Sequence, residues 1–232
     1  MIHLFHFLDD ILFPARCIIC GRDGTLLCKA CTMTFPFASQ TCPFCDAITD
    51  GLTCKKCSQT KKLNGAISLF DYEHPGVQKL IAHIKYRGLF SLIATLTADT
   101  EDVLVSYENL FPLSAALVPA PLRKTSFIER GFNQAEVIAK MVSKITGMRI
   151  SKNLAFSSRI RPQHLLSQNA RWEKIDNRVT VRYLAKDIKH AIVVDDLLTT
   201  GATLESCAQA LSQAGVKRIT GFTLARQKKL FR

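Results

Sequence analysis

The pattern of apolar and polar positions changes character near residue 60. Before that point cysteines and turn residues interrupt the apolar runs, whereas after it short apolar runs alternate with stretches of helical periodicity. Consecutive apolar residues predict buried strands, and apolar residues three or four positions apart predict amphipathic helices. We therefore expect a small cysteine-rich module over residues 1–60 and an α/β domain over residues 61–232.

The second part of the chain alternates predicted strands with predicted helices. Strands are expected at 66–72, 115–121, near 179–183, at 190–195 and at 218–225. Helices are expected at 76–86, 90–104, 133–147, around 170–177 and at 203–214. Such alternation indicates a mostly parallel sheet that is flanked by helices. The polar segment 157–169 is expected to be an irregular loop.

The first residues of the chain predict a short helix that packs on the protein's own core. Its apolar positions at helical spacing are Leu4, Phe5, Leu8, Ile11 and Leu12. A secretory signal is not expected, because the segment has no basic start and is interrupted by Asp9 and Asp10. No stretch of the sequence reaches the roughly 18–20 uncharged apolar residues that span a bilayer. We therefore expect a cytoplasmic protein without membrane insertion.

Eight of the nine cysteines form four CxxC pairs within residues 17–57. The pairs are Cys17–Cys20, Cys28–Cys31, Cys42–Cys45 and Cys54–Cys57. Reduced cysteines at this spacing favour metal binding over disulfides, and two pairs complete one tetrahedral site, so we predict two Zn²⁺ ions. Both should be structural, because no ligand position is left open for water. Pairing in sequence order is the simplest arrangement, a crossed pairing stays open, and redox-active dithiols are a weaker alternative.

The segment IVVDDLLTTGATL, residues 192–204, joins a buried strand to two acids and a turn rich in hydroxyls. Asp195 and Asp196 end the predicted strand, where the functional groups of an α/β sheet gather. Their carboxylates can accept hydrogen bonds from two vicinal ribose hydroxyls. Residues 199–203 form a turn into a helix, whose backbone N–H groups suit a phosphate. The segment therefore predicts a site for a ribose 5-phosphate.

The string VVDDLLTTGAT resembles the phosphoribosyl pyrophosphate (PRPP) binding motif of type I phosphoribosyltransferases. Further blocks resemble one branch of these proteins, the ComF family of competence-associated proteins. These blocks are CIIC and CKAC, LIAHIKYRG, VPAPLRKTSFIERGFNQAEVIA and RPQHLLSQNARWEKIDN. The resemblance covers almost the whole chain. It implies a type I phosphoribosyltransferase-like domain over residues 61–232, preceded by a small zinc-ribbon module.

The resemblance also implies roles for individual residues. Asp195 and Asp196 would be the catalytic acids that hold the ribose hydroxyls, directly or through Mg²⁺. Pro119–Arg123 would form the pyrophosphate loop, Arg130–Gln134 its far side and residues 157–167 a lid. The implied PRPP-binding residues are Thr199, Thr200, Gly201, Ala202, Thr203, Pro119, Arg123, Arg130, Arg159 and Arg161. Relatives that use hypoxanthine or guanine have an acid at the position of Thr199 for base protonation, which a threonine cannot supply.

The net charge of +12 lies entirely beyond residue 60, because five basic and five acidic residues cancel before it. Such an excess suggests a polyanionic partner, either nucleic acid or a phosphorylated small molecule. The ComF resemblance implies a role in DNA uptake and natural transformation, with single-stranded DNA and a competence helicase or other DNA-processing protein as partners. The alternative is a salvage phosphoribosyltransferase that transfers ribose 5-phosphate from PRPP to a nucleobase or small amine. Both hypotheses, the accessory protein and the enzyme, stand at this point.

Several other conspicuous residues have structural interpretations. Cys207 is expected to be a small buried core residue, and Trp172 is expected to pack in the interior. His164 is expected at the surface. Lys85–Arg87 follow an apolar helical pattern, and we expect these residues to cap that helix.

Overall fold

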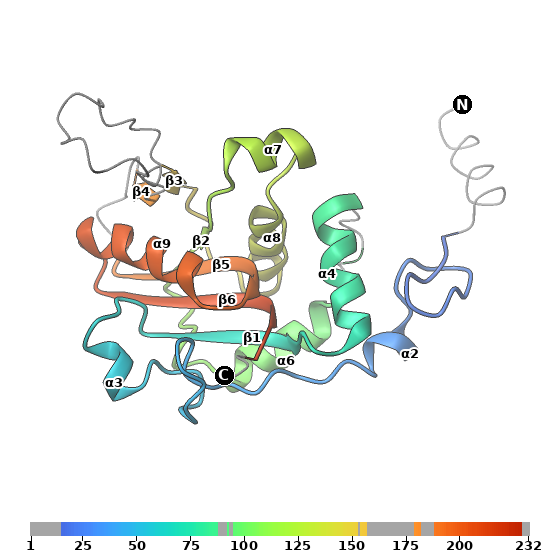
Figure 1. The fold of residues 1–232 in the computed structure, drawn as a ribbon, viewed down its shortest axis with the longest axis horizontal. Coiled ribbons are helices and arrows are strands. Elements are labelled where there is room, and N and C mark those ends of the chain that lie inside the picture. The colour runs from blue at the N-terminus through green and yellow to red at the C-terminus, as the bar shows by residue number, and fades with distance from the viewer. Residues whose placement is uncertain are drawn as a thin grey trace, which may run out of the picture.

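The computed structural model describes residues 15–87, 92, 95–152, 154–156, 179–181 and 188–228. In this part of the chain a parallel sheet lies between helices, and the cysteine-rich segment runs along one edge of the sheet (Figure 1). The predicted fold class, a helix-flanked parallel sheet preceded by a cysteine module, is therefore confirmed.

Four parallel strands form the main sheet in the order β1-β6-β5-β2. They are β1 (Gly65–Asp71), β2 (Ala116–Pro119), β5 (His190–Leu198) and β6 (Arg218–Arg226). Nearly all of their side chains are buried, as expected for parallel strands that are covered on both faces. Because the strands are parallel, their carboxyl ends share one edge of the sheet, and this edge carries Asp195 and Asp196.

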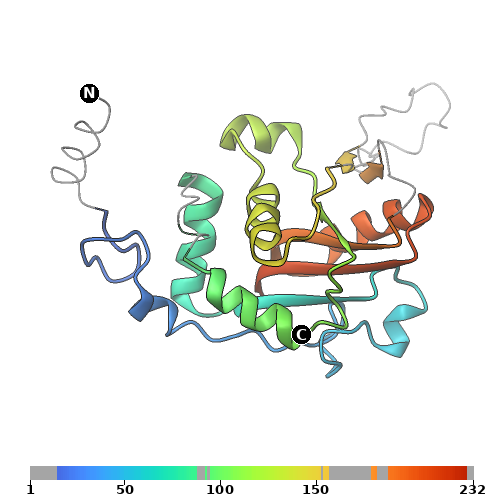
Figure 2. The same cartoon turned by 180° about the vertical axis from the view of Figure 1, so that it is seen from behind.

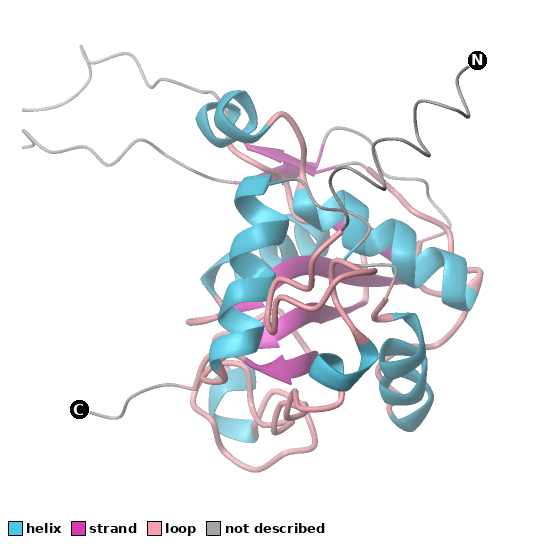
Figure 3. Ribbon diagram, turned by 90° about the vertical axis from the view of Figure 1, so that its right-hand side faces the viewer, coloured by secondary structure: helices cyan, strands magenta, loops and turns pink. Residues whose placement is uncertain are grey.

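Helices cover both faces of the sheet (Figures 2 and 3). On one face, α4 (Pro75–Arg87), α6 (Thr97–Ser106) and α8 (Gln134–Thr146) pack on a core that includes Ile192 and Val194. On the other face, α9 (Ala202–Gln213) packs on a core that includes Ala191 and Val193. We call these the α8 face and the α9 face. Because side chains along β5 alternate between the two faces, the carboxylates of Asp195 and Asp196 point to opposite faces of the sheet.

Two elements of the α/β domain were absent from the sequence expectations. One is α7 (Lys124–Arg130), a polar helix with no buried residue and hence no apolar stripe to reveal it. The strand expected near 179–183 exists as β4 (Val179–Val181), but it pairs antiparallel with β3 (Leu154–Phe156) in a separate small sheet. A three-residue strand such as β3 is too short to show a period of two.

The cysteine-rich segment covers the free edge of β1. The side-chain amide of Gln40 donates to the carbonyl of Ser68 and accepts from the Ser68 N–H. It thus makes the two hydrogen bonds that the backbone of a neighbouring strand would make. An antiparallel bridge joins Phe37 to Phe70, and another joins Leu52 to Gly65. Two short helices, α2 (Lys29–Thr32) and α3 (Lys55–Ser58), begin within the second and fourth CxxC turns. Covering an edge strand in this way satisfies its backbone groups and blocks pairing with another chain.

Some expectations fall outside the described residues. These are the N-terminal helix, the lid at 157–167 with Arg159 and Arg161, the helix around 170–177, and the side chains of His164 and Trp172. Within the described residues, no helix has the length and apolar character needed to cross a membrane.

Candidate functional site

A cleft opens at the carboxyl edge of the sheet, beside the ends of β2 and β5, and holds about 210 Å³. Its lining residues are Lys85, Ala120, Pro121, Leu122, Arg123, Ser126, Arg130, Asn133, Gln134, Asp195, Asp196 and Thr203. The acid pair, most of the expected pyrophosphate loop and the last residue of the expected phosphate loop therefore meet in one place. Three cations and two carboxylates are the charged groups of this lining.

The two acids lie on opposite faces of β5, near its carboxyl end at Leu198. Asp196 is buried on the α8 face, where its Oδ2 lies 3.3 Å from Lys85 Nζ and accepts a hydrogen bond from Gln134 Nε2 at 3.3 Å. Asp195 is partly exposed on the other face, where burial and, after it, the Asp195 charge raise the pKa of the Cys207 thiol on α9. The carboxylates thus approach the cleft from opposite sides of the strand, which gives a ligand two separate acidic contacts.

The environment of Asp195 disfavours its charged form. Burial and, after it, the neighbouring Asp196 charge raise the pKa of this carboxyl group to about 7, against the opposing effects of the Asp196 N–H and Lys85. The Asp196 N–H donates to Asp195 Oδ1 at 2.9 Å. A cation or a hydroxyl donor bound between the two acids would relieve this repulsion. The pair is therefore preorganised to hold such a group.

The connection from β2 to α7 forms the opposite wall. Ala120 extends the strand by donating its N–H to the carbonyl of Val194, and Asn133 Nδ2 holds the Ala120 carbonyl at 2.9 Å. Asn133 also caps α8, because its side chain accepts from the Ala135 N–H. These contacts fix the backbone that carries Arg123 into the cleft. Pro119 itself lies in the strand and pairs with Val194 rather than lining the cleft.

Two buried polar atoms of the cleft lack a hydrogen-bond partner among the described residues: Arg130 Nε and Gln134 Oε1. The Arg130 guanidinium lies over the exposed ring of Tyr86, 5.4 Å from its centroid. Buried polar groups in proteins are nearly always paired, so an unpaired donor and acceptor beside one cleft indicate a polar ligand.

The expected phosphate loop is the turn between β5 and α9. Gly201 caps α9 in the left-handed conformation with φ 78°, which glycine adopts without strain. Ala202 donates its N–H to Thr200 Oγ1, and Thr199, Thr200 and Ala202 are exposed. Within the described residues, Thr203 is the member of this loop that lines the cleft.

Lys85 corrects one expectation. It was predicted to cap its own helix, but α4 carries it into the cleft, where it pairs with Asp196. The prediction treated a lysine in the last turn of a helix as a local cap, which is the usual interpretation. The contact depends on how α4 lies over the sheet, and no local sequence pattern reports that arrangement. Cys207, by contrast, is fully buried in α9 as predicted.

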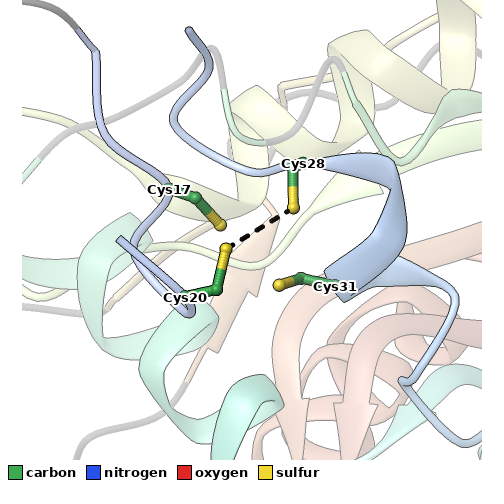
Figure 4. Close-up of side chains that lie close together, drawn as sticks. All are labelled: Cys17, Cys20, Cys28 and Cys31. Atoms are coloured by element: carbon green, nitrogen blue, oxygen red, sulfur yellow. Dashed lines mark hydrogen bonds between the residues drawn. The ribbon is translucent and has the colours of Figure 1, made fainter. Parts of the chain in front are cut away.

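The four CxxC pairs form two clusters in sequence order, so the crossed pairing is excluded. Cys17, Cys20, Cys28 and Cys31 form the first cluster (Figure 4), and Cys42, Cys45, Cys54 and Cys57 form the second. Within each cluster the Sγ atoms lie within 4.8 Å of one another, with Cys20–Cys28 at 3.8 Å and Cys45–Cys54 at 3.6 Å. Thiolates at ~2.3 Å from a tetrahedral zinc ion are separated by about 3.8 Å, so both clusters fit Zn²⁺.

The protonation of the thiols supports this interpretation. The backbone N–H of Cys57 is the main cause that lowers the pKa of Cys54 to about 7. In the same cluster, burial and the neighbouring thiols raise the pKa of Cys57 to about 12. Four thiols this close cannot all ionise unless a cation compensates their charge. Both clusters could therefore hold a metal ion.

The chain was compared with known proteins. A scan against models of protein families finds no match. DNA utilization protein YhgH of Salmonella typhi is 25% identical over 223 residues, which cover 92% of this chain and 97% of that protein. Competence protein ComFC of Streptococcus pneumoniae is 25% identical over 233 residues, which cover 91% of this chain and all of that protein.

A third relative, competence protein ComFC of Bacillus subtilis, is 28% identical over 154 residues, 65% of this chain and 60% of that protein. The first two alignments extend over about nine-tenths of the chain. Full-length similarity to ComFC and YhgH proteins, together with two four-cysteine clusters, confirms the resemblance to the ComF family that the sequence motifs predict.

Proposed function

We propose that the protein supports the uptake or use of DNA and that its cleft binds PRPP together with Mg²⁺. The first part follows from the names of its relatives, which are competence and DNA utilization proteins. The second part is carried by one observation: two acids at a strand end face Lys85, Arg123 and Arg130 across a cleft that also holds unpaired polar atoms. This set matches a sugar that carries phosphate groups at both ends.

Each group of the cleft has a role in this proposal. Asp195 and Asp196 accept hydrogen bonds from the ribose hydroxyls, and the turn at residues 199–203 holds the 5-phosphate. The guanidinium groups of Arg123 and Arg130 bind the pyrophosphate oxygens in a planar fork. Lys85 holds the Asp196 carboxylate in place and adds positive charge beside the departing pyrophosphate.

The donor set also suits Mg²⁺. This ion binds through one or two carboxylates plus substrate phosphates and keeps several water molecules. Asp195 and Asp196 supply such carboxylates, and a dication would offset the repulsion that raises the pKa of Asp195. When bound, Mg²⁺ supplies charge neutralisation at the pyrophosphate and orients it. Asp195 and Asp196 would be the acids that orient the ribose for displacement of pyrophosphate at the anomeric carbon, if the protein is an active phosphoribosyltransferase.

Single-stranded DNA is the proposed macromolecular partner. The excess of positive charge lies beyond residue 60, in the part of the sequence that forms the cleft. Tyr86 exposes 73% of its surface beside the guanidinium of Arg130, and Phe127 and Ile128 in α7 expose 50% and 83% of theirs. Exposed aromatic rings among cations suit bases and phosphates of a single strand without sequence preference. A competence helicase or another DNA-processing protein would be the cellular partner, in the cytoplasm.

The salvage phosphoribosyltransferase remains the second candidate, because the cleft brings together groups that would serve turnover as well as binding. Its weak point is Thr199, which is exposed in the turn and cannot protonate a base as an acid would. Release of pyrophosphate from PRPP in the presence of a nucleobase distinguishes the two. We further propose that residues 1–60 and residues 61–232 are the two domains, with two structural Zn²⁺ ions in the first.

Competition between PRPP and DNA tests the proposal. Fluorescence anisotropy of a labelled oligonucleotide would be recorded at several salt concentrations, with and without PRPP and Mg²⁺. Affinity should fall as salt rises, because phosphate contacts release counterions, and PRPP should displace part of the DNA. The DNA half of the proposal is wrong if the oligonucleotide does not bind at low salt. The proposal that DNA and PRPP share the cleft is wrong if saturating PRPP leaves DNA affinity unchanged.

A further inference from the structure

The second cysteine cluster lies against the turn that is proposed to hold the 5-phosphate. Its first CxxC turn is Cys42-Pro43-Phe44-Cys45. A methyl group built on Gly201 would lie 3.1 Å from Phe44 Cε1 and 3.1 Å from the carbonyl oxygen of Pro43. The turn therefore packs closely on the cysteine module, and an added carbon atom would fit only if its neighbours shifted.

A second contact holds the first turn of α9. Glu205 is buried, and its carboxylate accepts hydrogen bonds from the backbone N–H groups of Lys62 and Leu63 at 3.1 Å. These two residues follow the last CxxC turn after a few positions, and Lys61 places its Nζ 5.3 Å from the centroid of the Phe44 ring. The amino terminus of α9 is thus tied to both ends of the second cluster.

A third contact runs through the end of β6. Arg226 is 4% exposed and donates to the carbonyl oxygens of Thr41 and Cys42 at 2.8 and 2.7 Å, and to Asp46. The next residue, Gln227, donates its N–H to the carbonyl of Leu198, the last residue of β5 before the turn. The second cluster therefore contacts the turn at Gly201 directly and is linked to the end of β5 through Arg226 and Gln227.

The first cluster has a different position. Cys17, Cys28 and Cys31 belong to the core on the α8 face, whereas Phe44 packs on the α9 face. The two CxxC turns can be matched residue by residue: Ile19 in the first cluster occupies the place of Phe44 in the second, and both side chains are partly buried. The chain thus provides its own control for effects of the second cluster.

We propose that the second cluster is a positioning element for the phosphate turn, acting through Phe44, and that metal binding at this cluster and sugar-phosphate binding in the cleft strengthen each other. The inference rests on the proposed PRPP site. A metal ion that fixes Cys42 and Cys45 fixes Phe44 and Pro43 between them, and these hold Gly201 in the conformation that directs residues 199–203. Coupling between two binding sites is reciprocal, so each ligand raises the affinity of the other by the same factor.

The test compares the full-length, zinc-loaded protein with Phe44→Ala and with Ile19→Ala. Calorimetry would measure PRPP affinity in Mg²⁺, and hydrogen–deuterium exchange would measure protection of residues 199–203 without ligand. Phe44→Ala should weaken PRPP about 5- to 20-fold, within the usual range of coupling, and should speed exchange in the turn. Ile19→Ala should change neither measurement. Equal effects of the two variants, or no effect of Phe44→Ala, would overturn the proposal.

A second measurement needs no variant. A zinc-selective chromophoric chelator would be titrated into the wild-type protein with and without saturating PRPP and Mg²⁺. One of the two metal ions should then require about 5- to 20-fold more chelator at equilibrium, and the other should be unaffected. An unchanged titration contradicts the coupling. If the wild-type protein does not bind PRPP, the proposed function fails, and the exchange data alone decide whether Phe44 orders the turn.

Discussion

Asp196→Asn is the substitution whose effect follows most directly from the geometry of the cleft. It removes one negative charge and leaves the volume of the side chain almost unchanged. The Asp196 side chain is 8% exposed and lies 3.3 Å from Lys85 Nζ, so its charge acts in a largely water-excluded site. Loss of one charge-assisted contact to a ribose hydroxyl or to Mg²⁺ should cost about 1.5–3 kcal/mol of binding free energy. This corresponds to a ~10- to 150-fold weaker affinity for PRPP.

Folding should be much less affected than binding. Lys85 is 22% exposed, so its ammonium group can turn toward water when its partner loses charge, and we expect the free energy of unfolding to fall by ~1 kcal/mol at most. Calorimetry with PRPP and Mg²⁺, together with a denaturant melt, separates the two effects. Asp71→Asn is the matched control, because Asp71 also ends a strand and pairs with a lysine, Lys228 at 2.8 Å, outside the cleft. Unchanged PRPP affinity in a folded Asp196→Asn protein would refute the site.

Three further predictions concern metal, pH and DNA. Metal analysis of fully reduced protein should give two zinc ions per chain, and finding one or none contradicts the two-cluster interpretation. Burial and the charge of Arg218 lower the pKa of His190 to about 4, so the unfolded state binds the extra proton first. The contribution of His190 to stability should therefore be present above pH 6.5 and fall by about 3 kcal/mol as the pH drops to 4. His190→Gln should flatten this part of the stability curve, and an unchanged curve would contradict the role of His190. Arg123→Ala should reduce the salt dependence of single-stranded DNA binding by ~0.7 in log affinity per log salt, and an unaltered slope removes Arg123 from the DNA contact.

Sequence reasoning succeeded where the signal was local. The apolar run that ends in Asp195 and Asp196 predicted β5, and the CxxC spacing predicted two four-cysteine clusters. In each case the functional residues lie within a few positions of one another, and the backbone geometry of the strand or of the CxxC turn brings them together. The same holds for α8 (Gln134–Thr146), which agrees with the helix predicted at 133–147.

The remaining features depend on contacts between distant segments. Lys85 reaches Asp196 from another helix, and Phe44 meets Gly201 across more than half of the sequence. Neither residue carries a pattern that distinguishes it from an ordinary helix cap or a core aromatic residue. The polar helix α7 escaped prediction for a related reason, since it buries no side chain and therefore leaves no apolar stripe.

The most direct test of the whole account is a calorimetric titration of the wild-type, zinc-loaded protein with PRPP, in buffer with and without Mg²⁺. Two carboxylates facing three cations should bind the sugar phosphate only when the dication offsets the repulsion between Asp195, Asp196 and the pyrophosphate. The account predicts saturable binding of one PRPP per chain with Mg²⁺ and no measurable binding without it. Absence of binding at millimolar PRPP with Mg²⁺, or equal binding without Mg²⁺, would contradict it.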